Sequence, residues 1–163
     1  MGGIAMIGQI DKAKVDNEVR ELSRLKKKIM SLGAQRGTFQ GVTLQTLAAL
    51  DFFPMDRVSG PVGARTVRNA WGGSIEAGPS SFGPGSVSTP NNALFIRYNG
   101  VSSAACKQLG MQVGEIAQGV AVMDKWVKTP PMHGGTGAVV ITNLIAYCEQ
   151  VANNATIDFY LTK

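Results

Sequence analysis

An apolar stripe near the start of the chain is its clearest pattern. Within residues 11–32, apolar side chains recur every three or four positions, at Val15, Val19, Leu22, Leu25, Ile29 and Leu32. This spacing places them on one face of an α-helix, with charged residues on the other faces. The stripe covers only about three heptads at irregular spacing, which argues against a coiled coil. With Asp11 and Gly33 as candidate end residues, we expect a long helix over 11–33 that packs on a core.

Alternation of apolar and polar residues predicts strands later in the chain. Residues 93–98 and 156–161 alternate well, and Leu94, Ile96 and Tyr98 share one face. We also expect strands over 71–77 and 120–127, separated by Pro- and Gly-rich loops. One long helix followed by antiparallel strands is typical of an α+β domain with a single sheet.

Three shorter helices are expected between these strands. The first covers residues 43–50 and is ended by Pro54. Ser102 is a candidate N-cap for a helix over 103–113, and Thr142 for one over 143–151. Asn99-Gly100 predicts a turn after the strand at 93–98.

The length and composition of the chain indicate a single globular domain. The chain has 163 residues and a net charge of +5, and residues 12–36 hold eight Lys or Arg against three Asp or Glu. This basic stretch, including Lys26–Lys28, is interpreted as a solvated helix face, so nucleic acid is not an expected partner. Trp71 and Trp126 are expected in the core, with stacking on sugars or bases as the alternative.

The first residues do not resemble an export signal. No stretch reaches the ~18 apolar residues that a membrane span needs, and residues 1–10 lack the layout of a signal peptide. We interpret residues 1–10 as an expression scar or as the stub of a removed apolar helix.

Two cysteines, Cys106 and Cys148, are the main chemical candidates. They are compatible with one disulfide, two free thiols or half of a metal site. The chain has a single histidine, His133, which argues against zinc, and one disulfide outside the reducing cytosol is the simplest interpretation. A Cys–His hydrolase pair has no further support. Residues 134–137 lack the Lys-Ser/Thr ending of a phosphate loop. We therefore assign no catalytic, cofactor-binding or metal-binding residue and expect no enzyme.

Three local motifs resemble the type IVb pilins. They are Asn69-Ala70-Trp71-Gly72-Gly73 before the first strand, the helix from Val101 to Leu109 with the first cysteine, and the segment from Ile141 to Cys148 before a terminal strand. Their order and spacing are more specific than any one of them. The resemblance covers most of the chain from about residue 11.

The resemblance implies a single pilin domain over 1–163, in which the long helix packs on an antiparallel sheet. It pairs Cys106 with Cys148, and the disulfide-bounded region 106–148 lies exposed on a filament. Its loop, with Lys128, Met132 and His133, is the expected surface-contact loop.

The implied function is that of a structural subunit of a bacterial type IVb pilus, an extracellular filament used in adhesion, aggregation or mating contact. Its partners would be other pilin subunits and a receptor on a host cell or bacterium. Before assembly, a missing N-terminal helix would hold the subunit in the inner membrane, so the chain would be a truncated, soluble form. The alternative is a secreted binding module, such as an adhesin or a pseudopilin-like secretion component.

Overall fold

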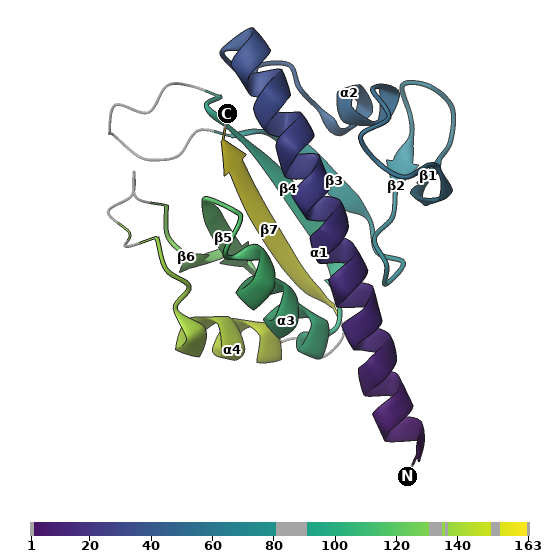
Figure 1. Ribbon diagram of the computed structural model, residues 1–163, viewed down its shortest axis with the longest axis vertical. Coiled ribbons are helices and arrows are strands. Elements are labelled where there is room, and N and C mark those ends of the chain that lie inside the picture. Colours follow the sequence, from purple (N-terminus) through teal and green to yellow (C-terminus); the bar gives the residue numbers. More distant parts are fainter. Residues whose placement is uncertain (1, 81–90, 131–134, 136, 151–153, 163) are drawn as a thin grey trace.

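The chain folds around one antiparallel sheet crossed by a long helix (Figure 1). This computed structural model describes residues 2–80, 91–130, 135, 137–150 and 154–162, with side chains described from residue 12 onward. The five strands follow the order β3-β4-β7-β5-β6. Helix α1 lies across one face of the sheet, and α3 and α4 lie beside it on the same face (Figure 1). The α+β architecture predicted from the sequence is confirmed.

Helix α1 (Gly2–Arg36) is longer at both ends than the predicted span of 11–33. Its apolar stripe is buried as expected, and Ile29 is fully covered. Gly33 does not end the helix. Gly37 does, because it adopts a φ of +76° and its N–H donates to the Gly33 carbonyl at 2.7 Å.

The sheet places the last strand at its centre. β7 (Ala155–Thr162) pairs with β4 (Ala93–Val101) on one side and β5 (Gly119–Val122) on the other. β3 (Ile75–Ser80) and β6 (Lys125–Lys128) form the edges. The inward side chains of β4 and β7 alternate as predicted and are buried, namely Leu94, Ile96, Tyr98, Ile157, Phe159 and Leu161.

Several strand boundaries differ from the prediction. β3 begins at Ile75 rather than at 71 and continues through Pro79, which is tolerated because β3 is an edge strand. The expected turn at Asn99-Gly100 is instead a register irregularity within β4, with Gly100 at a φ of +68°. The expected strand over 120–127 is a hairpin of β5 and β6, whose two turn residues have φ values of 52° and 65°.

The short helices match the prediction closely. α2 (Leu44–Ala49) begins with a capping box between Thr43 and Thr46. The Ser102 hydroxyl caps α3 (Ser103–Val113) by accepting from the Ala105 N–H at 3.1 Å. α4 (Ile141–Glu149) begins before Thr142 and has no side-chain cap.

Between α2 and β3 lie three short elements that the sequence did not predict. They are the 3-10 helix η1 (Met55–Arg57) and the strands β1 (Val58–Ser59) and β2 (Thr66–Val67). The two strands pair with each other in a separate small sheet.

Candidate functional site

The disulfide-bounded region is closed by two buried cysteines. Cys106 on α3 and Cys148 on α4 form a disulfide with a Cα–Cα distance of 5.7 Å, and both residues are fully buried. The bond holds α3 and α4 together on the face of the sheet that α1 also covers (Figure 1). Because both sulfurs are bonded, neither is a thiol nucleophile.

Lys128 does not lie on the surface as predicted. It is only 9% exposed, and its Nζ donates to the carbonyls of Gly114 and Ala117, both at 2.6 Å. These carbonyls belong to the turn that follows α3. The ammonium therefore ties β6 to the end of α3 and is not available to a partner. Met132 and His133 lie outside the described residues.

A second lysine reaches the same turn from α1. The Nζ of Lys26 donates to the Ile116 carbonyl at 2.5 Å. Cations are favoured at a helix C-terminus, where carbonyl groups remain unpaired. Burial lowers the pKa of the Lys128 ammonium, and the charge of Lys26 lowers it further. The pair fixes α1 to the disulfide-bounded region.

A buried carboxylate joins α1 to the sheet and to the segment before it. Glu18 is fully buried, accepts from the Tyr98 hydroxyl at 2.6 Å and from the Ala70 N–H at 2.9 Å, and forms an ion pair with Arg57. Burial, together with the Glu18 carboxylate, raises the pKa of Tyr98. Sequence reasoning missed Glu18, although it lies three residues after Val15 and four before Leu22, within the apolar stripe.

The Asn-Ala-Trp-Gly-Gly motif is a tight turn built around Asn69. The Asn69 side chain accepts from the N–H groups of Trp71 at 2.9 Å and Gly73 at 3.1 Å, and donates to the Asn99 carbonyl at 2.8 Å. A Cβ on Gly73 would lie 1.8 Å from that carbonyl oxygen, so only glycine fits. Trp71 is partly buried against the core, close to its predicted place.

An apolar groove runs between α1 and the end of α2. It has a volume of about 490 Å³, and Leu32, Leu50 and Phe52 form its apolar floor, with Lys27 and Lys28 at its rim. Leu50 is 51% exposed. The exposed Leu50 side chain is continuous with Leu32 and Phe52, so the groove presents apolar surface to solvent. We call these five residues the α1–α2 groove.

An apolar ridge lies on the disulfide-bounded region. It consists of Met111 on α3 with Val140, Ile141 and Ile145 at and along α4, each between 41% and 52% exposed. The exposed carboxylate of Glu115 lies nearby, because Glu115 and Met111 line the same hollow as Ile141. We call the four apolar residues the α4 ridge. In Figure 1, α4 and α2 lie on opposite sides of α1.

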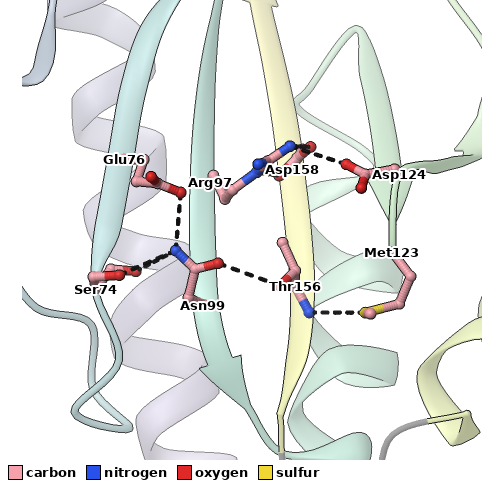
Figure 2. A network of polar contacts seen from close by, with 8 residues as sticks. All are labelled: Ser74, Glu76, Arg97, Asn99, Met123, Asp124, Thr156 and Asp158. Atoms are coloured by element: carbon pink, nitrogen blue, oxygen red, sulfur yellow. Dashed lines mark hydrogen bonds and ion pairs between the residues drawn. The ribbon is translucent and has the colours of Figure 1, made fainter.

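The face of the sheet opposite α1 carries a polar network (Figure 2). The Arg97 guanidinium forms two bonds to Asp158, at 2.7 and 2.9 Å, and one to Asp124 at 3.0 Å. Asn99 donates to Glu76 at 3.1 Å. The bond to Asp158 raises the pKa of Arg97, while burial raises the pKa of Asp158 more than Arg97 lowers it.

An aromatic row continues the same face. Trp126 lies here rather than in the core as predicted, with its ring centroid 4.9 Å from that of Tyr160. Phe95 lies on the other side of Tyr160 at 6.5 Å. None of the described helices carries an apolar stretch long enough to cross a membrane.

Comparisons with known proteins identify the family and the fold of the chain. A family model described as PilS N terminal matches residues 12–161. The fold is similar to the crystal structure of a type IV b pilin from Salmonella typhi, with a TM-score of 0.64 and 19% identity, covering 91% of this chain and 99% of that one. It is also similar to TcpA, a type IV pilin from Vibrio cholerae El Tor, with a TM-score of 0.63 and 16% identity, covering 92% and 99%. A comparison with curated proteins found no match.

Proposed function

Because the chain belongs to the PilS family and has the fold of type IVb pilins, we propose that it is a structural subunit of a bacterial type IVb pilus. The family match over residues 12–161 carries this proposal, since it spans the helix, the sheet and the disulfide-bounded region together. The protein acts by packing with other subunits rather than by catalysis.

Assembly uses the two apolar surfaces as a complementary pair. The α4 ridge of one subunit packs into the α1–α2 groove of the next. Because these surfaces differ and lie on opposite sides of α1, the contact is heterologous (Figure 1). A heterologous contact whose rotation does not close generates a helical filament, as a pilus requires. Charge supports the pairing, since Lys27 and Lys28 rim the groove while Glu115 flanks the ridge.

The assembled filament is extracellular, and the subunit is anchored in the inner membrane before assembly. The N-terminal part of α1 projects beyond the sheet (Figure 1), and this end of the helix would be directed toward the membrane before assembly. Release from the membrane would then place α1 in the filament interior.

A cysteine-pair experiment tests the assembly contact. Bacteria producing the protein with Leu50→Cys and Ile141→Cys together should give a ladder of disulfide-linked subunits on a non-reducing gel. Each single variant should not. Met55→Cys with Ile141→Cys is the matched control, because Met55 is 88% exposed but lies outside the groove.

Electron microscopy of cells lacking the gene tests the function itself. Filaments should disappear and return when the gene is restored. Unchanged filaments would refute the structural-subunit proposal and favour a secreted binding module. Filaments that need the gene but give no ladder would refute only the proposed contact.

A further inference from the structure

The aromatic row on the outer face of the sheet has no part in the assembly contact. Phe95, Tyr160 and Trp126 come from β4, β7 and β6, and their rings cross the strands one after another. The Phe95 and Trp126 rings are tilted by 46° and 52° against Tyr160. The row therefore forms an uneven aromatic surface rather than a stack. All three residues are partly exposed.

Two glycines let the outer rings lie down over the sheet. A Cβ on Gly78 of β3 would lie 3.1 Å from Cε1 of Phe95. A Cβ on Gly119 of β5 would lie 2.7 Å from Cγ of Pro130 and 3.0 Å from Cζ3 of Trp126. A larger residue at Gly78 would press on the Phe95 ring, and one at Gly119 would press on Pro130 and on the Trp126 ring. Glycine in a strand otherwise weakens it and often marks a close approach. Both glycines thus widen the aromatic surface.

Hydrogen-bonding groups lie on the same face of the sheet as the aromatic row, and Figure 2 shows these groups. Arg97 lies two residues after Phe95 on β4, so both side chains are on this face. The Arg97 guanidinium carbon is 5.9 Å from the centroid of the Phe95 ring. Asp124 accepts from Arg97 through Oδ1 and is 79% exposed, so its other oxygen faces solvent. Glu76 is also exposed.

The charge balance of this face limits the chemistry of its ligand. Three carboxylates, Glu76, Asp124 and Asp158, surround the single cation Arg97, which gives the network a net charge of −2. An excess of negative charge repels phosphate and sulfate groups. It suits a neutral or cationic ligand that also covers aromatic rings.

We propose that this face binds a glycan of β-linked pyranoses with neutral or amino substituents. The axial C–H groups of such a sugar are weakly positive and pack on the negative faces of Trp126 and Phe95. Asp124 accepts from a sugar hydroxyl or ammonium group, and Arg97 is held in place by Asp158 beside the rings. The filament would then display one such site on each subunit.

NMR titration of the purified, isotope-labelled chain tests the proposal. The probes are cellotriose, which is neutral, and chitotriose, which has the same linkage with ammonium groups. Both should shift the Trp126 indole N–H and the amides of β4 and β6, and neither should shift Trp71, which lies in the turn at 69–73. Chitotriose should bind about fivefold more tightly, as expected for an exposed ion pair.

Variants separate stacking from charge. Trp126→Ala should weaken both probes by about tenfold or more, the loss expected for one stacked ring, while Trp71→Phe leaves both unchanged. Asp124→Asn should remove the preference for chitotriose and keep cellotriose binding. Melting temperatures show whether each variant folds. If Trp126→Ala does not fold, Phe95→Leu provides the test of stacking instead.

Three results would overturn the proposal. They are no saturable shift with either sugar, shifts that map to another face, or tighter binding of a sulfated heparin tetrasaccharide than of cellotriose at this same face. None of these results bears on filament formation, so the pilus proposal stands or falls separately.

Discussion

The Tyr98 hydroxyl donates to the Glu18 carboxylate at 2.6 Å, and this bond crosses the core between helix α1 and strand β4. The same carboxylate accepts from the Ala70 N–H and pairs with Arg57. One buried side chain therefore connects the helix, the sheet and the segment that joins them.

Replacing Glu18 with Ala should destabilise the fold strongly. The change leaves Arg57 and the Tyr98 hydroxyl without their acceptor, and breaking a buried ion pair costs about 3–5 kcal/mol. Urea unfolding followed by circular dichroism measures the loss. Glu21→Ala is the matched control, because Glu21 lies on the same helix with its side chain 29% exposed and should cost much less. Equal losses for the two variants would contradict the role of Glu18.

Gly73→Ala should be destabilising because of one contact. The new Cβ would lie 1.8 Å from the Asn99 carbonyl oxygen, so the turn must shift and the Asn69 bonds must stretch. We expect a loss of about 1–3 kcal/mol, typical of overpacking, measured by thermal or urea unfolding.

Gly72→Asn is the control for that variant. Gly72 has a φ of +80°, which asparagine tolerates, and no atom lies within 4 Å of its built Cβ. A full-sized loss at Gly72 with none at Gly73 would refute the steric explanation.

Lys128→Met should loosen the disulfide-bounded region. The variant keeps the aliphatic stem but removes the donor from the carbonyls of Gly114 and Ala117, at a cost of about 1–3 kcal/mol for unsatisfied buried groups. Hydrogen exchange should rise at the end of α3. Lys27→Met, at an exposed position on α1, should change stability by less than about 0.5 kcal/mol.

The same lysine gives a pH signature. Its pKa is lowered from 10.5 in the folded state, so the unfolded chain binds more protons between the two values. Stability therefore rises with pH across that window, and Lys128→Met should remove this rise. A rise that persists unchanged in the variant would assign it to another group.

Tyrosine burial predicts alkaline unfolding. Burial, and then the charge of Asp158, raises the pKa of Tyr160 from 10.0 to about 12, so between these values the unfolded chain loses a proton that the folded chain keeps. Stability should therefore fall as the pH rises through that window, by less than about 1.4 kcal/mol per pH unit for Tyr160, because solvent screens this partly exposed group. Tyr98 acts in the same direction.

Tyr160→Phe isolates that contribution. Urea midpoints measured between pH 10 and 12 should fall less steeply in the variant than in the parent chain. Parallel pH profiles would mean that Tyr160 titrates alike in the folded and unfolded states.

Elements with a local signal were predicted well from sequence. The apolar stripe marked α1, the Ser102 cap marked α3, and alternation marked β4 and β7. The β5–β6 hairpin was missed because Met123 and Asp124 adopt positive φ without the glycine that usually indicates such a turn. β1 and β2 are two residues each, too short for any periodicity.

The positions and contacts of individual side chains were harder to predict from the sequence. Lys128 was placed on the surface because the resemblance to type IVb pilins made its loop the expected contact surface, yet its long stem reaches carbonyls that only the folded chain brings close. Glu18 had a signal in its spacing, but its partners come from residues 57, 70 and 98, which no local pattern connects. Trp126 was expected inside because tryptophan is largely buried on average, whereas strand register places it on the outer face.

The central position of β7 constrains the order in which the chain can mature. Residues 155–162 are the last strand to be synthesised, yet they fill the gap between β4 and β5. Until they arrive, the sheet is two separate hairpins and α1 has no complete surface to cover. The five-stranded sheet therefore cannot be completed before residues 155–162 are available. Cys106 and Cys148 both precede β7 in the chain, so their disulfide can join α3 to α4 before the sheet is complete.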